Sequence, residues 1–233
     1  MKLGIIGAMQ VEVEILLSVM ENTAATEKAG STFYEGILEG IPAVVVQCGV
    51  GKVNAAICAQ ILCDGYGVTH LVNTGIAGSL NAKLDIGDLV VSKDAMYHDF
   101  NCVHFGYEMG KVPGMDVVSF PADPEMIRLA YDAAETVNPG HTTIGRVASG
   151  DLFVAEKDAK DAIIQVTGGL CTEMEGAAIA QTAYRNKVPF VILRAISDKA
   201  DDSASMDYPT FERIAAHRCA QVTRNLAVHL ANA

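Results

Sequence analysis

The chain has 233 residues; half of them are apolar, 19% are charged, and 17 Lys and Arg stand against 28 Asp and Glu, for a formal net charge of −11. The apolar share excludes a disordered protein, and the length is that of one large domain or two small ones; the alternation of strands and helices described below favours a single domain over residues 1–233. A nucleic-acid-binding protein needs a basic surface, so the acidic balance excludes nucleic acid as a partner.

No targeting or membrane segment is expected. Residues 3–9 are apolar but too few for a signal sequence, and the longest charge-free window, residues 65–82, contains polar residues that a bilayer would not accept. The six cysteines form no Cys-x-x-Cys pair, which is typical of reduced, buried thiols. These features predict a cytoplasmic protein that does not bind membranes.

Strands and helices alternate along the first half of the chain. The β-branched run at residues 2–7 predicts a strand, and the apolar spacing over residues 8–20 predicts a helix. Residues 32–39 and 41–48 predict the two strands of a hairpin that turns at Gly40. The other elements expected here are a helix over residues 52–63 and strands over residues 70–73 and 88–92.

The second half continues this alternation after a loop at residues 97–114 that is rich in Gly, His and aromatic residues. Asp207 is expected to cap the last helix, with Pro209 in its first turn. The alternation predicts an α/β fold, a three-layer α/β/α sandwich with a central mixed sheet. The expected helices cover residues 124–137, 156–166, 176–186 and 208–231, and the strands cover residues 143–149, 169–172 and 188–196.

Charged residues stand at the ends of several predicted strands. Glu12 follows the first strand, Glu175 follows the strand at 169–172, and Arg194 and Asp198 lie at the end of the strand at 188–196. Ligands of such sheets bind outside the carboxyl ends of the strands, so these side chains indicate a site at that edge. A cation in a buried strand needs an anionic partner, for which Glu12 and Glu175 are the candidates. On the residues alone, Glu12 also fits a solvated helix face and Asp198 a turn cap.

Two patterns that would indicate a metal or a cofactor are incomplete. The spacing of His98, Asp99 and His104 is compatible with metal binding, but no further ligand follows nearby. Gly49 and Gly51 lack the third glycine of a dinucleotide fingerprint, and the chain contains no P-loop. No metal and no cofactor are therefore predicted.

A set of motifs covers essentially the whole chain. In order they are Gly4-Ile-Ile-Gly-Ala-Met9 with Glu12, Asn73-Thr-Gly-x-Ala-Gly78, Phe105-Gly-Tyr107, Pro113-Gly114, Ser149-Gly-Asp-x-Phe153, Glu173-Met-Glu175 and Arg194-Ala-Ile-Ser-Asp198. Together they resemble the 5′-methylthioadenosine/S-adenosylhomocysteine nucleosidases of the purine nucleoside phosphorylase-like superfamily. The resemblance implies a nucleoside phosphorylase-like fold and hydrolysis of the N-glycosidic bond of 5′-methylthioadenosine, S-adenosylhomocysteine and 5′-deoxyadenosine, in methionine salvage and the clearance of methyl-cycle by-products.

The resemblance also implies catalytic roles. Asp198 would protonate the adenine ring, Glu12 would take a proton from the attacking water, and Arg194 would orient the carboxylates around that water. Glu175 would hold the ribose hydroxyls, with Met174 packed under the sugar. These residue types suit the reaction, because breaking the bond needs an acid for the base and a carboxylate near the developing positive charge. The pKa of Asp198 is expected to be raised by partial burial.

Further residues are implied to bind the substrate. Phe153 would stack on the adenine and the backbone of Val154 would read its edge. Many relatives have Ser where this chain has Ile76, which removes one possible hydrogen bond near the ribose. The other implied substrate-binding residues are Gly78 and Ser197, with Met9, Val50 and Tyr208 at the 5′-thio group and Phe105, Tyr107 and Pro113 reaching the pocket from a second subunit, so that a homodimer is implied.

Two other functions compete with hydrolysis. A nucleoside phosphorylase needs cations around its phosphate, yet the first arginine of the chain is Arg128, and Glu12 would repel the phosphate. A protein that binds adenosine-like ligands without turnover would not need Glu12, Glu175 and Asp198 together. Among hydrolase substrates, the three nucleosides above and 6-amino-6-deoxyfutalosine differ mainly beyond the 5′ carbon, where an apolar pocket discriminates weakly.

Overall fold

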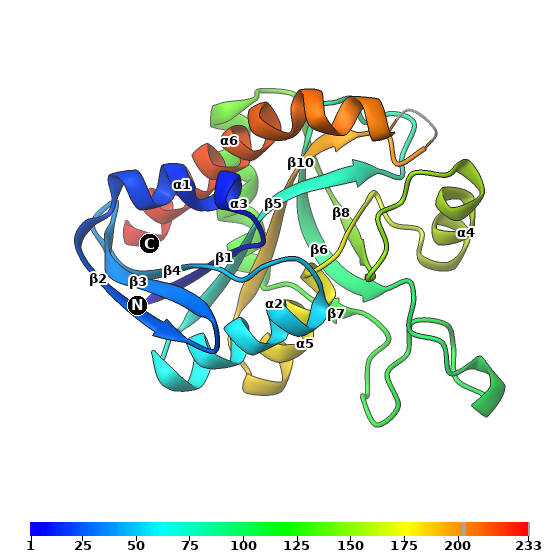
Figure 1. Ribbon diagram of the computed structural model, residues 1–233, viewed down its shortest axis with the longest axis horizontal. Helices are drawn as coiled ribbons and strands as arrows, with labels where there is room; N and C mark the ends of the chain where they lie inside the picture. Colours follow the sequence, from blue (N-terminus) through cyan, green and yellow to red (C-terminus); the bar gives the residue numbers. More distant parts are fainter. Residues whose placement is uncertain (202–203, 233) are drawn as a thin grey trace.

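The computed structural model describes residues 1–201 and 204–232, with residues 204–207 described by their backbone only. Within this part of the chain, ten strands form one mixed sheet with helices on both faces (Figure 1), which confirms the predicted fold class. The strands are β1 (Leu3–Gly7), β2 (Glu21–Lys28), β3 (Ser31–Leu38), β4 (Ile41–Gln47), β5 (His70–Ser79), β6 (Leu89–Tyr97), β7 (Phe120–Pro121), β8 (Thr142–Ser149), β9 (Cys171–Glu173) and β10 (Phe190–Asp198).

Four parallel strands, β4, β1, β5 and β10, form the middle of the sheet. The sheet continues from β10 through β6 and β8 to β9, and β9 pairs back with β5. Because β5 pairs with both β10 and β9, five strands close on themselves at one end of the sheet. The register places Arg194 opposite Gly75 and Asp198 opposite Gly78, so the charged end of β10 lies against the glycine-rich end of β5.

The helices form two layers with separate apolar cores. One core joins the sheet to α1 (Gln10–Val19), α3 (Pro124–Val137) and α6 (Ala204–Ala231), and the other joins it to α2 (Lys52–Gln60) and α5 (Gly176–Asn186). The segment α4 (Lys157–Thr167) packs in a smaller cluster beside the closed end. The local sequence specifies where α3 begins. Asp123 caps the helix by accepting hydrogen bonds from the backbone N–H groups of Glu125 and Met126, and Pro124 follows as the first helical residue.

Several element boundaries differ from those that the sequence predicts. Strand β2 was not predicted, since it is almost entirely exposed and polar and forms only as the outer partner of β3. Strand β5 extends to Ser79 rather than ending at Asn73, because pairing with β10 and β9 holds the glycine-rich segment extended. Helix α6 begins at Ala204, so Pro209 lies inside it rather than in its first turn. The side chain of Asp207, the predicted cap, lies outside the described residues.

Between β6 and β7 the chain forms a long excursion that projects from the body of the molecule (Figure 1). It contains the short 3₁₀ turn Val103–Phe105, and the side chain of Phe105 is 78% exposed. Across the described ranges, the chain has no helix with the length and apolarity needed to traverse a bilayer.

Candidate active site

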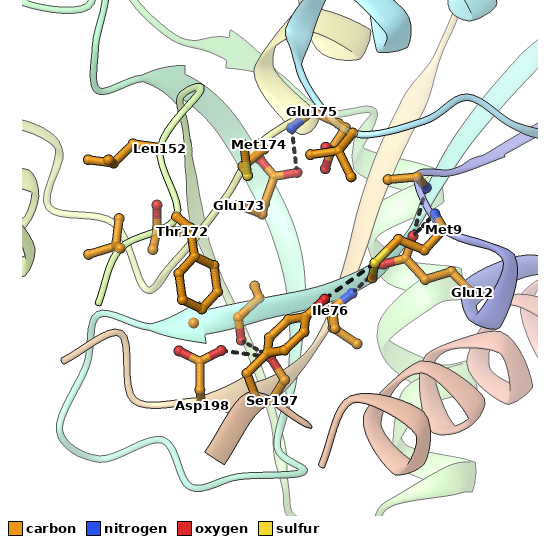
Figure 2. A pocket seen from close by; sticks show the side chains of 17 residues that line it. Met9, Glu12, Ile76, Leu152, Thr172, Glu173, Met174, Glu175, Ser197 and Asp198 are labelled. Atoms are coloured by element: carbon orange, nitrogen blue, oxygen red, sulfur yellow. Dashed lines mark hydrogen bonds between the residues drawn. The ribbon is translucent and has the colours of Figure 1, made fainter. Parts of the chain in front are cut away.

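A cavity of about 330 Å³ opens at the carboxyl ends of β1, β5 and β10. Three acidic side chains that the sequence singled out, Glu12, Glu175 and Asp198, line this one cavity (Figure 2). The other predicted site residues that line it are Met9, Val50, Ile76, Gly78, Phe153, Val154, Met174, Ser197 and Tyr208, and the lining residues that were not predicted are Ala8, Ala77, Leu152, Thr172 and Glu173.

The carboxylate of Glu12 is held by backbone N–H groups at the start of α1. Its Oε2 accepts hydrogen bonds from Ala8 N at 2.6 Å and Met9 N at 2.9 Å, and its Oε1 accepts one from Ile76 N at 3.0 Å. Burial raises the pKa of Glu12, while the charge of Arg194 and these hydrogen bonds oppose the rise. Two donors from the loop before α1 and one from β5 therefore fix a carboxylate whose proton affinity is increased.

Glu173 is the most fully hydrogen-bonded acid of the site. Its carboxylate accepts from the backbone N–H groups of Glu175 at 3.1 Å and of Gly176 at 3.0 and 2.8 Å, from the hydroxyl of Ser149, and from Arg194. These donors lie around the turn between β9 and α5. The acid is buried and satisfied, as a buried charge must be.

Arg194 lies behind the cavity wall and does not line the cavity. The sequence favoured Glu12 or Glu175 as its partner, but Nη2 donates to Glu173 and, at 2.5 Å, to Asn73 Oδ1, while Glu175 Oε2 lies 3.9 Å away. Burial works to lower the pKa of Arg194, but the charges of the three glutamates raise it above its usual value. The guanidinium thus stays charged and holds the carboxylates together.

Glu175 lies beside this pair and faces the cavity. Its Oε1 accepts a hydrogen bond from Gly51 N at 2.8 Å, from the loop between β4 and α2. Burial and the neighbouring charge of Glu173 raise the pKa of Glu175 to about 7. At neutral pH the protonated and ionised forms of Glu175 are therefore present in comparable amounts.

Asp198 faces the cavity from the end of β10, away from the glutamates (Figure 2). Its Oδ2 accepts a hydrogen bond from the hydroxyl of Ser197 at 2.8 Å, and its Oδ1 accepts one from Ala200 N at 2.8 Å. The residue is only 2% exposed. The site therefore presents acids on two sides of one hollow.

Aromatic and sulfur-containing side chains complete the cavity. The rings of Phe153 and Tyr208 meet edge to face with centroids 5.4 Å apart, and the Tyr208 hydroxyl donates to Glu212 Oε1 at 3.1 Å and contacts Met9 Sδ at 3.3 Å. The exposed fraction of Phe153 is 48%, so its ring is open to a ligand. This wall can pack against a flat base and an apolar substituent.

Three predicted site residues lie away from the cavity. Phe105, Tyr107 and Pro113 belong to the projecting excursion between β6 and β7 and are not among the residues that line the cavity in this chain. Phe105 and Tyr107 are exposed. The structure leaves them available to a neighbouring molecule.

Sequence reasoning singled out the run Glu173-Met174-Glu175 but assigned no role to Glu173. A signal was present, because an acid at the end of a buried strand is costly unless it is paired. The resemblance directed attention to the second acid of Glu173-Met174-Glu175 instead. Glu173 ends β9 and Glu175 is the N-cap residue of α5, so the turn between them places both acids near Arg194.

The histidine-containing loop gives no support to metal binding. Asp99 Oδ2 accepts from Lys52 Nζ at 2.5 Å, and His104 packs edge-on against the ring of Phe105. Among the residues that the structure describes, no three His, Cys, Asp or Glu side chains are grouped as a metal site would require.

The fold and the site together define a class, the phosphorylase superfamily, whose family model matches residues 2–227. A 5′-methylthioadenosine/S-adenosylhomocysteine nucleosidase of Chromohalobacter salexigens is 41% identical over 95% of this chain and 94% of its own length. A relative of the same name from Exiguobacterium is 37% identical over the full length of both chains.

Comparison with a solved structure supports the same family. The nucleosidase of Neisseria meningitidis, in complex with methylthio-immucillin-A, superposes with a TM-score of 0.95 at 35% identity, over 98% of this chain and 99% of the other. Full-length identity of this extent shows the family. The chain belongs to the 5′-methylthioadenosine/S-adenosylhomocysteine nucleosidases within that superfamily.

Proposed function

We propose that this protein hydrolyses the N-glycosidic bond of 5′-methylthioadenosine and S-adenosylhomocysteine, releasing adenine and the 5-thioribose moiety. The observation that carries the proposal is the meeting of Glu12, Glu175 and Asp198 around one cavity of about 330 Å³. Such a hollow has the size of a nucleoside-binding pocket. The reaction serves methionine salvage and the clearance of methyl-cycle by-products, and 5′-deoxyadenosine is a further substrate of the same kind.

Asp198 acts as the acid. Cleavage of the bond builds positive charge on the sugar and negative charge on the departing adenine, and a proton donated to the adenine ring makes the base a neutral leaving group. The hydroxyl of Ser197 and the N–H of Ala200 fix the two oxygens of Asp198 and so its orientation. Phe153 stacks on the adenine, and the backbone of Val154 reads its edge.

Glu12 acts as the base for the attacking water. Burial raises the pKa of Glu12, which makes its carboxylate a stronger proton acceptor than an exposed glutamate. Its negative charge also lies where the oxocarbenium-like sugar develops positive charge. Arg194 limits the mutual repulsion of the acids, because its pKa is raised and it remains charged.

Glu175 accepts hydrogen bonds from the ribose hydroxyls, and Met174 packs under the sugar. Met9, Val50 and Tyr208 receive the 5′-thio substituent, and Gly78 lies at the adenine end opposite Asp198. Ile76 places an apolar side chain where a hydroxyl would give one more hydrogen bond to the sugar region.

Hydrolysis is favoured over phosphorolysis by the charge of the cavity. Among the described residues, those that line it include Glu12, Glu173, Glu175 and Asp198 and no Lys, Arg or His. A phosphate would meet carboxylates without a compensating cation, whereas water is neutral. A binding protein without turnover would gain nothing from burying several acids around its ligand.

The assembly is a homodimer in this proposal. Phe105, Tyr107 and Pro113 lie on the projecting excursion, and exposed aromatic side chains of this kind commonly mark a protein interface. They would complete the 5′ end of the partner's cavity. The six free cysteines, of which Cys48, Cys58, Cys171 and Cys219 are buried, favour a reducing, cytoplasmic location.

The test is incubation of the purified protein with 5′-methylthioadenosine in phosphate-free buffer and measurement of free adenine. We expect adenine and methylthioribose at equal amounts, without phosphate. Release that requires phosphate and yields a ribose 1-phosphate would establish a phosphorylase instead, and binding without adenine would establish a sensor. Comparison of kcat/KM among 5′-methylthioadenosine, S-adenosylhomocysteine, 5′-deoxyadenosine and 6-amino-6-deoxyfutalosine then ranks the substrates.

A further inference from the structure

A group of charged side chains outside the cavity connects three of the loops that surround it. Lys52 Nζ donates to Asp99 Oδ2 at 2.5 Å and lies 3.7 Å from Asp151 Oδ2. The backbone N–H of Asp151 donates to the same Asp99 oxygen at 2.9 Å. None of the three residues lines the cavity. We refer to Lys52, Asp99 and Asp151 as the loop clamp.

The loop clamp also caps a helix from outside. Gly51 is the N-cap residue of α2 and has no side chain to accept a hydrogen bond from the first turn. Asp151 supplies this acceptor, because its Oδ1 accepts from Lys52 N at 2.9 Å. A carboxylate at this position is also favoured by the partial positive charge of the helix N-terminus.

Two members of the loop clamp lie next in sequence to residues that form the cavity wall or bind one of its side chains. Asp151 directly precedes Leu152 and Phe153, which line the cavity, and Lys52 directly follows Gly51, whose N–H binds Glu175. Partial burial works to raise the pKa of Asp99, but the hydrogen bonds from Lys52 and Asp151 hold it below its usual value. Asp99 is therefore ionised at neutral pH, so the contact with Lys52 is a charged one.

The backbone conformation of Gly51 brings it close to the side chain of Asp151. Gly51 has φ of +100°, and a Cβ built on it would lie 3.2 Å from Asp151 Oδ1. The backbone therefore passes close to Asp151 in a conformation that other residues rarely adopt. Asn54 Nδ2 donates to Val50 O at 2.7 Å, on the other side of the peptide group that carries the Gly51 N–H, and Asp151 fixes the helix start that follows.

We propose that Lys52, Asp99 and Asp151 are positioning residues, which hold the Gly51 N–H against Glu175 and the Phe153 loop over the cavity. The proposal deepens the proposed function, on which it rests, because Glu175 is assigned to the ribose and Phe153 to the adenine. The loop clamp touches no reacting atom and acts through these two binding groups. It therefore contributes chiefly to substrate binding.

The experiment compares Lys52→Met, which keeps the aliphatic stem and removes the charge, with Lys2→Met. Lys2 forms an ion pair of similar length with Glu35, at 2.6 Å, and the side chains of Lys2 and Lys52 are 25% and 23% exposed. For Lys52→Met we expect KM for 5′-methylthioadenosine to rise by about 10- to 100-fold, with a much smaller fall in kcat. Lys2→Met leaves both unchanged. Lys52→Arg restores most of the binding, because its guanidinium reaches both carboxylates.

Amide hydrogen exchange without substrate provides a readout that does not depend on activity. We expect Lys52→Met to speed exchange at residues 48–51 and 150–154, and Lys2→Met to leave these segments unchanged. If the wild-type protein released no adenine, the proposed function would fail while exchange still decided whether the loop clamp orders the loops. An active Lys52→Met variant with unchanged KM and unchanged exchange overturns the inference, as does a variant that only melts at a lower temperature.

Discussion

The charges beside the cavity and the ion pairs on the outside of α3 use the same chemical groups in different surroundings. On α3, Arg128 donates to Glu125 at 2.6 Å and to Asp132 at 3.2 Å, and all three side chains are at least half exposed. In the site, the side chains of Arg194 and Glu173 are 2% and 3% exposed. Water solvates the first group whether or not its members pair, whereas the second group depends entirely on its partners.

The difference in exposure determines what each group can contribute to stability and to catalysis. Exposed ion pairs on a helix add little to stability, because solvent competes for both charges. Buried acids carry altered proton affinities, which suit them for catalysis but cost stability where they are not fully paired. Substitutions made in matched pairs, one in each region, test whether burial is the property that matters.

The largest expected effect is on catalysis. Asp198→Asn keeps the size of the side chain but cannot donate the proton to adenine, so we expect kcat to fall by about 100- to 10,000-fold. Adenine release from 5′-methylthioadenosine measures this, and thermal unfolding checks that the fold is kept. Asp132→Asn on α3 is the control, with activity unchanged. Turnover of Asp198→Asn close to that of the wild type would remove Asp198 as the acid.

The next effect is on stability. Arg194→Met removes the cation from three buried glutamates and leaves their charges uncompensated, so we expect the free energy of unfolding to fall by about 3–5 kcal/mol. Urea denaturation monitored by circular dichroism measures the loss. Arg128→Met removes only solvated contacts, so the midpoint of its urea denaturation should be nearly unchanged. Equal losses for the two variants would contradict the role given to burial.

The two regions also differ in the sign of their response to pH. The pKa of Glu175 is about 7 when folded, against an ordinary value of 4.5, so the folded state retains a proton that the unfolded chain releases between these values. The wild type should therefore lose unfolding free energy, relative to Glu175→Gln, as the pH rises from about 4.5 to about 7. Glu125 behaves oppositely, because its hydrogen bond with Arg128 lowers its pKa and its contribution is lost on acidification.

Kinetics provide an independent check on Glu175. The ionised carboxylate accepts hydrogen bonds from the ribose hydroxyls, so kcat/KM of the wild type should rise with pH up to about 7. This acidic limb should be absent from Glu175→Gln, whose overall activity is lower. A limb that persists unchanged in the variant would assign the titration to another group.

The sequence was most informative where the chemistry of a position is local. A run such as Val191-Ile-Leu-Arg194 indicates a buried cation without any structure, and the order of strands and helices predicts the edge at which ligands bind. Partners across the fold were harder to predict. Glu173 becomes the main partner of Arg194 only because β9 is three residues long and turns directly into α5.

Elements that depend on tertiary pairing also lay beyond sequence reasoning. Strand β2 has no apolar alternation and is specified by hydrogen bonds to β3. The loop clamp joins Lys52 to Asp99 and Asp151, which lie 47 and 99 residues further along the chain. No spacing rule connects such positions, whereas Glu12, in the first turn of α1, lies only five residues after the end of β1.

The smallest expected effect concerns Ile76, an apolar residue between the two acidic sides of the cavity. Ile76→Ser supplies a hydroxyl near the sugar while the backbone N–H that holds Glu12 remains. One hydrogen bond contributes about 0.5–1.5 kcal/mol, so kcat/KM for 5′-methylthioadenosine should change by about tenfold or less. Ile76→Val, which stays apolar, controls for the lost volume. A change of 1,000-fold in Ile76→Ser alone would mean that this side chain controls the acids themselves, because a single neutral hydrogen bond cannot supply that much free energy.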